Sequence, residues 1–533
     1  MNLNLSPSRL GVLLVLFGWG TLAAQAPPGP AEPAPSVGKA DEVKLDEKEV
    51  ERIARLLSEY EQALQVQRQP GVRKATKIKE QLDEFLEKIA AQGRDPLKAV
   101  TSWWEIFSSD KYHRFEGRSG RWNGLKCLFP DSLGKQLPVI YNLWVSSEYR
   151  ARTSSPTVLC LHPRQARFSA TDYLRQFWST RELQDAATIL VAPEFPDGVP
   201  PDGRWSDRAS LYATMGVLGE GVLPPKYNVD FNRLFLDGYL DGATEVWGLL
   251  SQLGHVFAGA IIRGGAPPEN TRLEDFTNVA FLLVGIPGAS LDPEKADALG
   301  ARMRALGIDV TVANLAEAPQ PRKERDAFKE VEAVVPALLT KRRNPYPEKI
   351  DWSVKANNTR ICFYVRSTGE VESEAIKDPQ ARKKPPSFQV SIDRAGNRLV
   401  IQCHRILGLV ISLNDRVLDL DRDVTFQVNE KVVYNGKADR KFHRLYDSFE
   451  NSGDWTRIFT WTHEIEVPPP EPAPKPEAGT PDGAAKPADG AGEKPPAGKE
   501  PPPGDKPPAQ DKPPAQGKPP AEDQPAAGEK PPA

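Results

Sequence analysis

Short apolar strands alternate with helical segments from residue 103 to residue 340, and this pattern constrains the fold more than any other feature of the chain. The predicted strands are 139–145, 157–161, 187–191, 234–236, 258–262, 279–284 and 309–313. Strands without polar alternation are typical of parallel sheets, whose two faces are both covered by helices. Residues 103–340 are therefore predicted to form an α/β domain with a mostly parallel sheet.

A second pattern occupies residues 346–467, where apolar and polar residues alternate. The clearest runs are 388–392 and 424–428; a turn at 395–397 follows the first, and a hairpin at Asn429-Glu430 follows the second. A period of two is typical of strands with one buried face, and short strands separated by turns indicate a sandwich. We expect a small antiparallel β-sandwich after the α/β domain.

Helical periodicity fills residues 45–102. Apolar residues recur at three- and four-residue steps in the runs 50–64 and 78–89, and Pro70-Gly71 separates the two runs. This pattern predicts an antiparallel helical hairpin. A coiled-coil dimer is the alternative, but two short runs pack more easily on a neighbouring domain. We expect Trp103-Trp104 to pack the hairpin on the sheet, with carbohydrate stacking as the alternative role.

The N-terminus has the pattern of a secretion signal. Arg9 precedes an apolar run at 10–22, and Ala24-Gln25-Ala26 has small residues at both key positions of a signal-peptidase site. The run is too short to span a bilayer comfortably, and no later stretch is long and apolar enough to do so. We expect residues 1–26 to be a cleaved signal peptide, with a retained anchor as the alternative. The mature protein is then secreted, periplasmic or held in the cell envelope.

Two further segments have the composition of unstructured chain. Residues 27–44 are rich in Pro, Ala and Glu, as expected of a linker. Residues 468–533 consist mainly of Pro, Ala, Gly, Lys, Glu and Asp. Without apolar residues this segment cannot form a core, so we expect a disordered, polyproline-II-biased tail.

Composition excludes several classes of function. The formal net charge is −3, with 69 basic and 72 acidic residues mixed along the chain, which argues against a concentrated basic face for nucleic acid. The 4 cysteines are too few for a disulfide framework or a zinc cluster, and the histidines show no metal-ligand spacing. We expect no metal or cofactor. Cys160 is predicted to be a buried thiol, whereas Cys362 and Cys403 form either one disulfide or two core thiols.

The segment 230–265 carries the strongest indication of chemistry. A short strand runs into Asp237-Gly238-Tyr239-Leu240-Asp241-Gly242, and a helix follows. A sharp strand-to-helix turn, with small residues two positions before and two after its apex, is a nucleophile elbow. Gly238 and Gly242 fit this geometry because a Cβ at either position would collide with the neighbouring strand or helix.

The segment resembles secreted bacterial α/β-hydrolases of the esterase, dienelactone-hydrolase and prolyl-oligopeptidase-like group, in which the turn reads G-x-S-x-G. The resemblance extends over about residues 136–340. It implies that His162 is the histidine of the oxyanion loop and that the catalytic acid falls at or near Gly288. The region after Tyr346 is similar to a C-terminal domain that often follows such hydrolases.

The chain departs from the family at each catalytic position. Leu240 stands where the nucleophilic serine belongs, and Pro163, which has no N–H, follows His162. Gly288 carries no carboxylate, and Asp292 is predicted to cap a helix. The histidine base is expected in the loop around 316–320, where this sequence has none.

Asp241 offers one remaining nucleophile. As a displaced nucleophile it would place Tyr239 at the first small position of the turn, where the elbow has no room. A carboxylate stabilised at a helix N-terminus explains Asp241 better.

These departures favour a secreted, non-catalytic pseudo-hydrolase that binds an envelope protein, a glycan or a small ligand. The alternative is an active ester or peptide hydrolase that uses non-standard residues. A third interpretation makes the α/β domain a spacer between hairpin and sandwich. A pocket above Leu240 would distinguish a binding protein from a spacer.

Overall fold

The structure is a computed structural model that describes residues 42–66, 69–130, 136–164, 168–195, 223, 226–320, 323–355, 360–372 and 379–468. The predicted signal peptide, nearly all of the predicted linker and the predicted tail lie outside these residues. The chain divides into two compact units, 1–470 and 471–533, and every described residue belongs to the first. The predicted boundaries between hairpin, α/β part and β part remain predictions.

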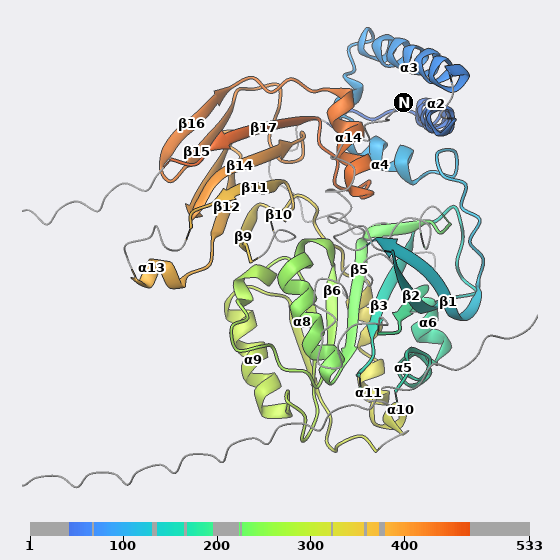
Figure 1. Ribbon diagram of the computed structural model, residues 1–533, viewed down its shortest axis with the longest axis vertical. Coiled ribbons are helices and arrows are strands. Elements are labelled where there is room, and N and C mark those ends of the chain that lie inside the picture. The colour runs from blue at the N-terminus through green and yellow to red at the C-terminus, as the bar shows by residue number, and fades with distance from the viewer. Residues whose placement is uncertain are drawn as a thin grey trace, which may run out of the picture. The chain divides into compact units, whose positions relative to one another are not determined.

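An eight-stranded sheet forms the centre of the α/β part (Figure 1), with the strand order β1-β2-β4-β3-β5-β6-β7-β8. The strands are β1 (Gly120–Pro130), β2 (Gln136–Val145), β3 (Ser155–Leu161), β4 (Ile189–Pro193), β5 (Val229–Tyr239), β6 (Gly259–Arg263), β7 (Ala280–Gly285) and β8 (Val310–Asn314). The pairs β1–β2 and β2–β4 are antiparallel, and the remaining pairs are parallel. The mostly parallel sheet predicted from the apolar runs is confirmed. β1 was not predicted, because its residues 120–128 are half-buried or exposed and form no apolar run.

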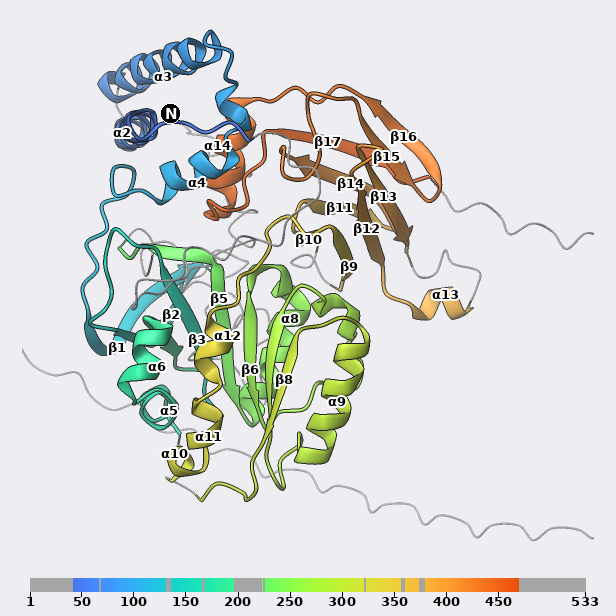
Figure 2. The same cartoon turned by 180° about the vertical axis from the view of Figure 1, so that it is seen from behind.

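Helices cover both faces of this sheet, as predicted (Figures 1 and 2). They are α5 (Ala170–Phe177), α6 (Arg181–Ala187), α8 (Asp241–Leu253), α9 (Pro293–Ala305), α10 (Glu324–Ala327), α11 (Lys329–Glu332) and α12 (Val335–Leu339). Successive side chains of a strand point to opposite faces. On β5, Leu234 and Leu236 therefore join the cluster that includes α8 and α9, whereas Phe235 joins the cluster with α5, α6, α11 and α12.

The β part consists of a four-stranded sheet, β10-β11-β14-β17, and a five-stranded sheet, β16-β15-β13-β12-β9. The strands are β9 (Lys349–Ser353), β10 (Ile361–Cys362), β11 (Val365–Glu370), β12 (Ser387–Asp393), β13 (Arg398–His404), β14 (Ile406–Leu413), β15 (Val424–Val428), β16 (Lys431–Gly436) and β17 (Trp461–Glu466); α13 (Pro379–Lys383) precedes β12. Phe426 of β15 contacts Trp461 of β17 at 5.9 Å between ring centroids, so the two sheets share one apolar layer. The hairpin at Asn429-Glu430 is confirmed, and both residues have the positive φ of a type I′ turn, 46° and 69°.

The predicted sandwich needs one correction, because not every strand pair in it is antiparallel. β13 and β15 run parallel, with Leu399 opposite Phe426. The chain leaves β13 for β14 in the other sheet before it returns as β15, so the two neighbours have the same direction. Alternation along a strand shows which face is buried but does not identify the neighbouring strand.

The N-terminal helices are α2 (Glu47–Gln65), α3 (Gln69–Ala90), η1 (Pro96–Lys98) and α4 (Val100–Ser108). The predicted helix pair is present, but Pro70 and Gly71 lie in the first turn of α3 and not between the helices. Proline is tolerated there because the N–H groups of a first turn have no partner within the helix.

The sequence suggested that Trp103 and Trp104 pack the hairpin on the eight-stranded sheet, but their ring contacts outside α4 are with α14 (Phe442–Ser452) and Tyr346. Trp103 is fully buried and contacts Phe442 of α14 at 5.7 Å between centroids. Trp104 stacks on Tyr346 at 6.2 Å. Both rings therefore join α4 to the β part, and a fully buried Trp103 cannot stack on a sugar.

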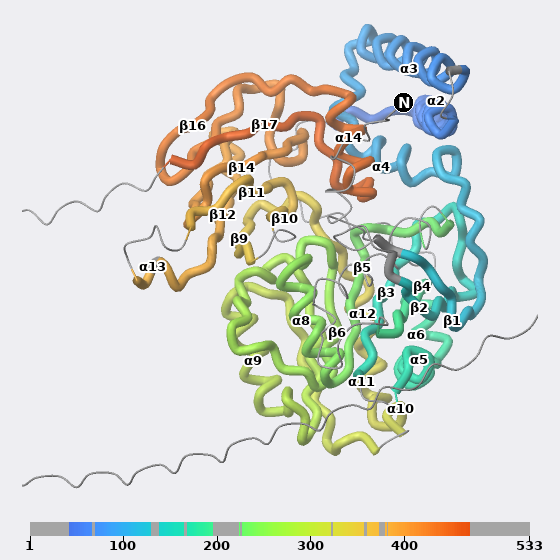
Figure 3. Tube along the Cα trace, in the orientation of Figure 1, coloured from blue at the N-terminus to red at the C-terminus, as the bar shows by residue number. Residues whose placement is uncertain are grey.

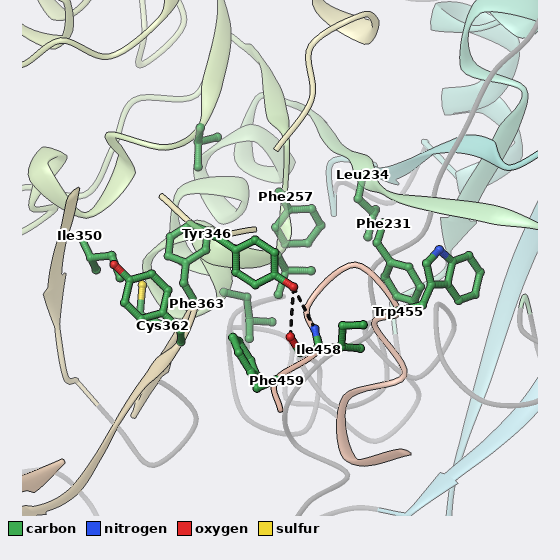
Figure 4. Close-up of a cluster of buried hydrophobic side chains, with 14 of the residues drawn as sticks. Phe231, Leu234, Phe257, Tyr346, Ile350, Cys362, Phe363, Trp455, Ile458 and Phe459 are labelled. Carbon is green, nitrogen blue, oxygen red and sulfur yellow. Dashed lines mark hydrogen bonds between the residues drawn. The ribbon is translucent and has the colours of Figure 1, made fainter. Parts of the chain in front are cut away.

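A continuous hydrophobic cluster joins the α/β part, the β part and α4. Figure 3 follows the chain from the green strands through α10–α12 into the β part. Where the two parts meet, Phe231 and Phe257 lie with Tyr346, Trp455 and Ile458 in one buried layer (Figure 4). The Tyr346 hydroxyl donates to the carbonyl of Ile458 and accepts from its N–H, both at 3.2 Å. We call this region, at the amino ends of β5 and β6, the junction.

The four cysteines are free thiols. Cys160 is buried, as predicted. Cys362 lies on β10 and Cys403 on β13, which belong to different sheets, and no disulfide joins them. Of the two alternatives for this pair, the structure has the separate thiols.

Candidate functional site

The carboxyl end of β5 turns sharply into α8 at Leu240, which has φ 50° and ψ −115°. A positive φ is strained for a bulky side chain. The Leu240 N–H donates to the Arg263 carbonyl at 2.8 Å, and the Leu240 carbonyl accepts from the Thr244 N–H at 3.0 Å. These bonds hold the apex between β6 and the first turn of α8. The geometry is that of a nucleophile elbow.

The glycines of the turn are required by close backbone contacts. A Cβ on Gly238 would lie 2.6 Å from the Gly242 carbonyl oxygen, and a Cβ on Gly242 would lie 2.3 Å from that of Leu161. Gly265 was not predicted to take part, yet a Cβ there would lie 2.4 Å from the Thr244 nitrogen. No side chain fits at these distances without moving the backbone.

The apex side chain itself is aliphatic and half-buried. Leu240 packs against the cluster between the sheet and α5, α6 and α12. Its partial exposure shows that it is not a fully buried core residue. It has no atom that can attack a carbonyl.

Asp241 begins α8, as predicted, and its carboxylate accepts a hydrogen bond from a backbone N–H of the oxyanion loop. The Arg164 N–H donates to Asp241 Oδ2 at 3.0 Å. Because Pro163 has no N–H, the next N–H of the loop after His162 is the one that Asp241 accepts. An oxyanion in this place would have to compete with a carboxylate of the protein.

His162 faces a residue that the sequence did not single out. Its Nε2 lies 3.4 Å from Glu194 Oε2, and its Nδ1 lies 2.8 Å from the Pro163 carbonyl oxygen. Glu194 follows β4 and also accepts the Ala170 N–H at 3.2 Å. Burial raises the pKa of Glu194, but the bonds from His162 and Ala170 outweigh it, and the pKa lies below its ordinary value. His162 is thus held by an ionised carboxylate.

The predicted acid position is empty of acids. Gly288 lies in a turn after β7 with φ +79°. Asp292 caps α9, as predicted: its Oδ1 accepts the Lys295 N–H at 2.9 Å and its Oδ2 contacts Lys295 Nζ at 2.7 Å. These bonds hold the pKa of Asp292 below its usual range. The loop 315–320 after β8 contains no histidine.

A buried ion pair beneath the elbow was missed by sequence reasoning. Arg263 Nε lies 2.9 Å from Asp237 Oδ1, and the two side chains are 1% and 0% exposed. The Trp178 indole N–H donates to Asp237 Oδ2 at 2.7 Å, and the guanidinium lies 4.8 Å from the Phe177 ring centre. The sequence feature that could have indicated this pair is Arg263 itself, a charged residue at the end of an otherwise apolar strand. The pair links β5 to β6 directly below the turn.

Further features bear on ligand and membrane binding. Among the described residues, no group of three or more His, Cys, Asp and Glu side chains is placed to hold a metal ion. Within the same ranges no helix is both long and apolar enough to cross a bilayer. Surface hollows of about 480 Å³ lie along α2, between Lys48 and Glu59, and across β14 and β17, around Leu407 and Ile465. Neither hollow includes a residue of the elbow.

No known family matches the sequence, and no curated protein does. Solved structures do match. A thermostable esterase is 19% identical, with 41% of this chain and 63% of the esterase covered and a TM-score of 0.34. A predicted CIB-like hydrolase from Thermoplasma acidophilum is 13% identical, with 42% and 99% covered and a TM-score of 0.29. A dienelactone hydrolase-like promiscuous phosphotriesterase from metagenomic libraries is 16% identical, with 37% and 82% covered and a TM-score of 0.29.

The chain spans less than two thirds of the length of that esterase. Its own strand order, the helices on both faces and the strained turn after β5 define the fold. This protein has an α/β-hydrolase-like fold, preceded by a helix pair and followed by two smaller β-sheets.

Proposed function

We propose that this protein is a non-catalytic pseudo-hydrolase that binds a partner or ligand in the cell envelope. The observation that carries the proposal is the elbow itself. Its backbone holds the strained conformation of a nucleophile turn, but the apex is Leu240 and the neighbouring Asp241 accepts the Arg164 N–H.

Acyl transfer needs a nucleophile, a base that takes its proton, and donors for the oxyanion. Leu240 supplies no nucleophile. The loop 315–320 supplies no histidine, and Asp292 is engaged as a helix cap. Asp241 is a negative charge where an oxyanion would need positive partners. Because these groups act as a unit, the loss of any one removes most of the activity.

Close packing around the turn explains why its strained shape persists without a catalytic role. A backbone in a disfavoured region costs about 1–3 kcal/mol and survives where its surroundings over-determine it. Close contacts at Gly238, Gly242 and Gly265 do so here. The elbow is therefore maintained by packing between β3, β5, β6 and α8.

The test is hydrolysis by the mature protein. We expect no turnover of simple esters or peptides above background and no labelling by a serine-directed fluorophosphonate. Leu240→Ser should remain inactive because no base activates the serine, and Leu240→Ser with Asp241→Ala, which frees the Arg164 N–H, should remain inactive for the same reason.

The alternative, an active hydrolase with non-standard residues, makes a different prediction. It would have to recruit His162, which lies beside the turn and is held by Glu194. Saturable hydrolysis by the wild type that His162→Gln abolishes would overturn the pseudo-hydrolase proposal. His443→Gln, at an exposed position of α14, is the matched control.

We further propose export, on the strength of the N-terminal pattern of Arg9, the apolar run and Ala24-Gln25-Ala26. The partner would be an envelope protein, a glycan or a small ligand. N-terminal sequencing of the purified native protein should give a start near Pro27, and a pulldown from the envelope fraction should recover the partner. A mature protein that retains residues 1–26 in the cytoplasm would contradict export.

A further inference from the structure

The junction contains a buried ion pair between two parts of the chain. Arg343 follows α12, and its side chain is 0% exposed. Its Nη2 lies 2.7 Å from Asp454 Oδ2 and also donates to Thr456 Oγ1 at 2.8 Å. Its Nη1 donates to the His255 carbonyl at 3.1 Å, at the amino end of β6. Asp454 is therefore paired with Arg343, of which only the Nε has no hydrogen-bond partner among the described residues.

A second arginine lies in the same turn without such a partner. The Arg457 N–H donates to the Asp454 carbonyl at 3.1 Å, so the two residues are close in the fold. The Arg457 side chain belongs to a residue that is 4% exposed, and its Nε and Nη1 have no hydrogen-bond partner among the described residues. A buried guanidinium with two unused donors requires a counter-group, and the described residues do not supply one.

His255 adds a third unused group. It is 1% exposed, and neither ring nitrogen has a hydrogen-bond partner in the described part of the chain. Its ring packs edge-on against Trp352 at 5.8 Å and Phe363 at 6.1 Å. Burial lowers the pKa of His255 well below its ordinary value, and Arg457 and Arg343 lower it further. The imidazole is therefore neutral and has one N–H to donate.

Among the described residues, the charges at this place do not balance. The side chains of Arg343 and Arg457 are buried with one carboxylate, that of Asp454, and this carboxylate contacts Arg343. Two other buried carboxylates near the junction are already paired: Asp275 contacts Arg272 at 3.1 Å and Lys355 at 2.9 Å, and Asp230 contacts Arg233 at 3.2 Å and Arg342 at 2.6 Å. Burial lowers the pKa of Arg457 to about 10, so it stays charged near neutral pH. Among the residues that the structure describes, one positive charge is left over in a low-dielectric place, where an unpaired charge is costly.

We propose that the junction binds a small monovalent inorganic anion, of the halide class, at the Arg457 guanidinium, in the buried region that also contains the His255 ring. One negative charge neutralises the excess, and N–H donors alone are sufficient to hold a halide. A divalent oxyanion would reverse the imbalance. The ion stabilises the contact between the α/β part and the β part, which is independent of whether the elbow has any chemistry.

Bromide provides the direct probe. Crystals of the mature protein grown in sodium bromide should show a bromine anomalous peak beside Arg457. At fixed ionic strength, the melting temperature of the protein should be a few degrees higher in chloride or bromide than in gluconate. A junction that holds only water, with no anomalous peak and equal melting temperatures in chloride and gluconate, overturns the proposal.

Two variants locate the effect. Arg457→Met removes the excess charge and keeps an apolar side chain of similar length, so it should abolish the dependence of melting temperature on halide. Arg342→Met is the matched control, since this arginine is 47% exposed and pairs with Asp230; it should retain the full halide dependence. Persistence of the halide effect in Arg457→Met would also overturn the proposal. If Arg457→Met fails to fold, the bromide map of the wild type decides alone.

Discussion

The two ends of the eight-stranded sheet use polar side chains in opposite ways. At the carboxyl end, the elbow has catalytic geometry but its polar groups are tied to each other, as Asp241 is to Arg164 and His162 to Glu194. At the amino end, the junction has no feature of an active site, yet Arg343 and Arg457 are buried as deeply as core residues. The carboxyl end thus keeps the shape of a nucleophile turn with its polar groups paired, and at the amino end buried charges hold two parts of the chain together.

This contrast predicts the largest effect at the junction. Arg343→Met leaves Asp454 buried without its partner, and such a loss typically costs about 3–5 kcal/mol. Urea unfolding, followed by tryptophan fluorescence, should show that decrease in the free energy of unfolding. Arg342→Met, at a partly exposed pair, should cost no more than about 1 kcal/mol. If the two variants lower the free energy of unfolding equally, the buried pair at the junction contributes no more to stability than a partly exposed pair.

The second prediction concerns how stability depends on pH, through a histidine that packs on Trp455 of the junction. Burial lowers the pKa of His113, which packs on Trp455 at 5.8 Å, to about 4 from 6.5. Below pH 6.5 the unfolded chain binds a proton that the folded chain refuses, so stability falls as the pH decreases from 6.5 to about 4, by about 3 kcal/mol in total. His113→Phe should remove this part of the acid sensitivity, and exposed His443→Gln should not. Unchanged pH dependence in His113→Phe would assign the acid sensitivity to other groups.

At the elbow, the expected effect is smaller and purely steric. Gly242→Ala places a Cβ 2.3 Å from the Leu161 carbonyl oxygen, and overpacking of this kind costs about 1–3 kcal/mol. Gly254→Ala is the control, because its Cβ would lie 3.6 Å from the nearest atom, in ordinary contact. Thermal unfolding of both variants compares them. A tolerated Gly242→Ala would mean that the turn relaxes easily and is not over-determined.

The smallest change in stability is expected at the apex. Leu240 is only half-buried, so Leu240→Ser should lower the free energy of unfolding by about 1 kcal/mol. The variant should gain no ester hydrolysis, measured with a chromogenic ester beside the wild type. Substantial turnover after this one change would show that a base and an oxyanion site are still in place, and the contrast between the two ends would disappear.

Much of this architecture was predictable because its signals are local. Apolar runs marked seven of the strands, and the small residues around Leu240 marked the turn. Asp292 was predicted as a helix cap from the proline behind it, and it caps α9. β1 escaped prediction because an edge strand with exposed side chains has no apolar run. Pro70 was taken for a break because its position relative to a helix start depends on where the preceding turn ends.

By itself, the sequence determined which elements form, which faces they bury and which catalytic residue types are missing at their expected positions. Each of these follows from residues a few positions apart. Only the tertiary structure decided the partners: Arg343 and Asp454 are separated by 111 residues, and Asp237 and Arg263 by 26. A charged side chain is buried only where another part of the chain meets it, and a local pattern contains no information about that meeting. For the same reason the sequence predicted the elbow but not the junction.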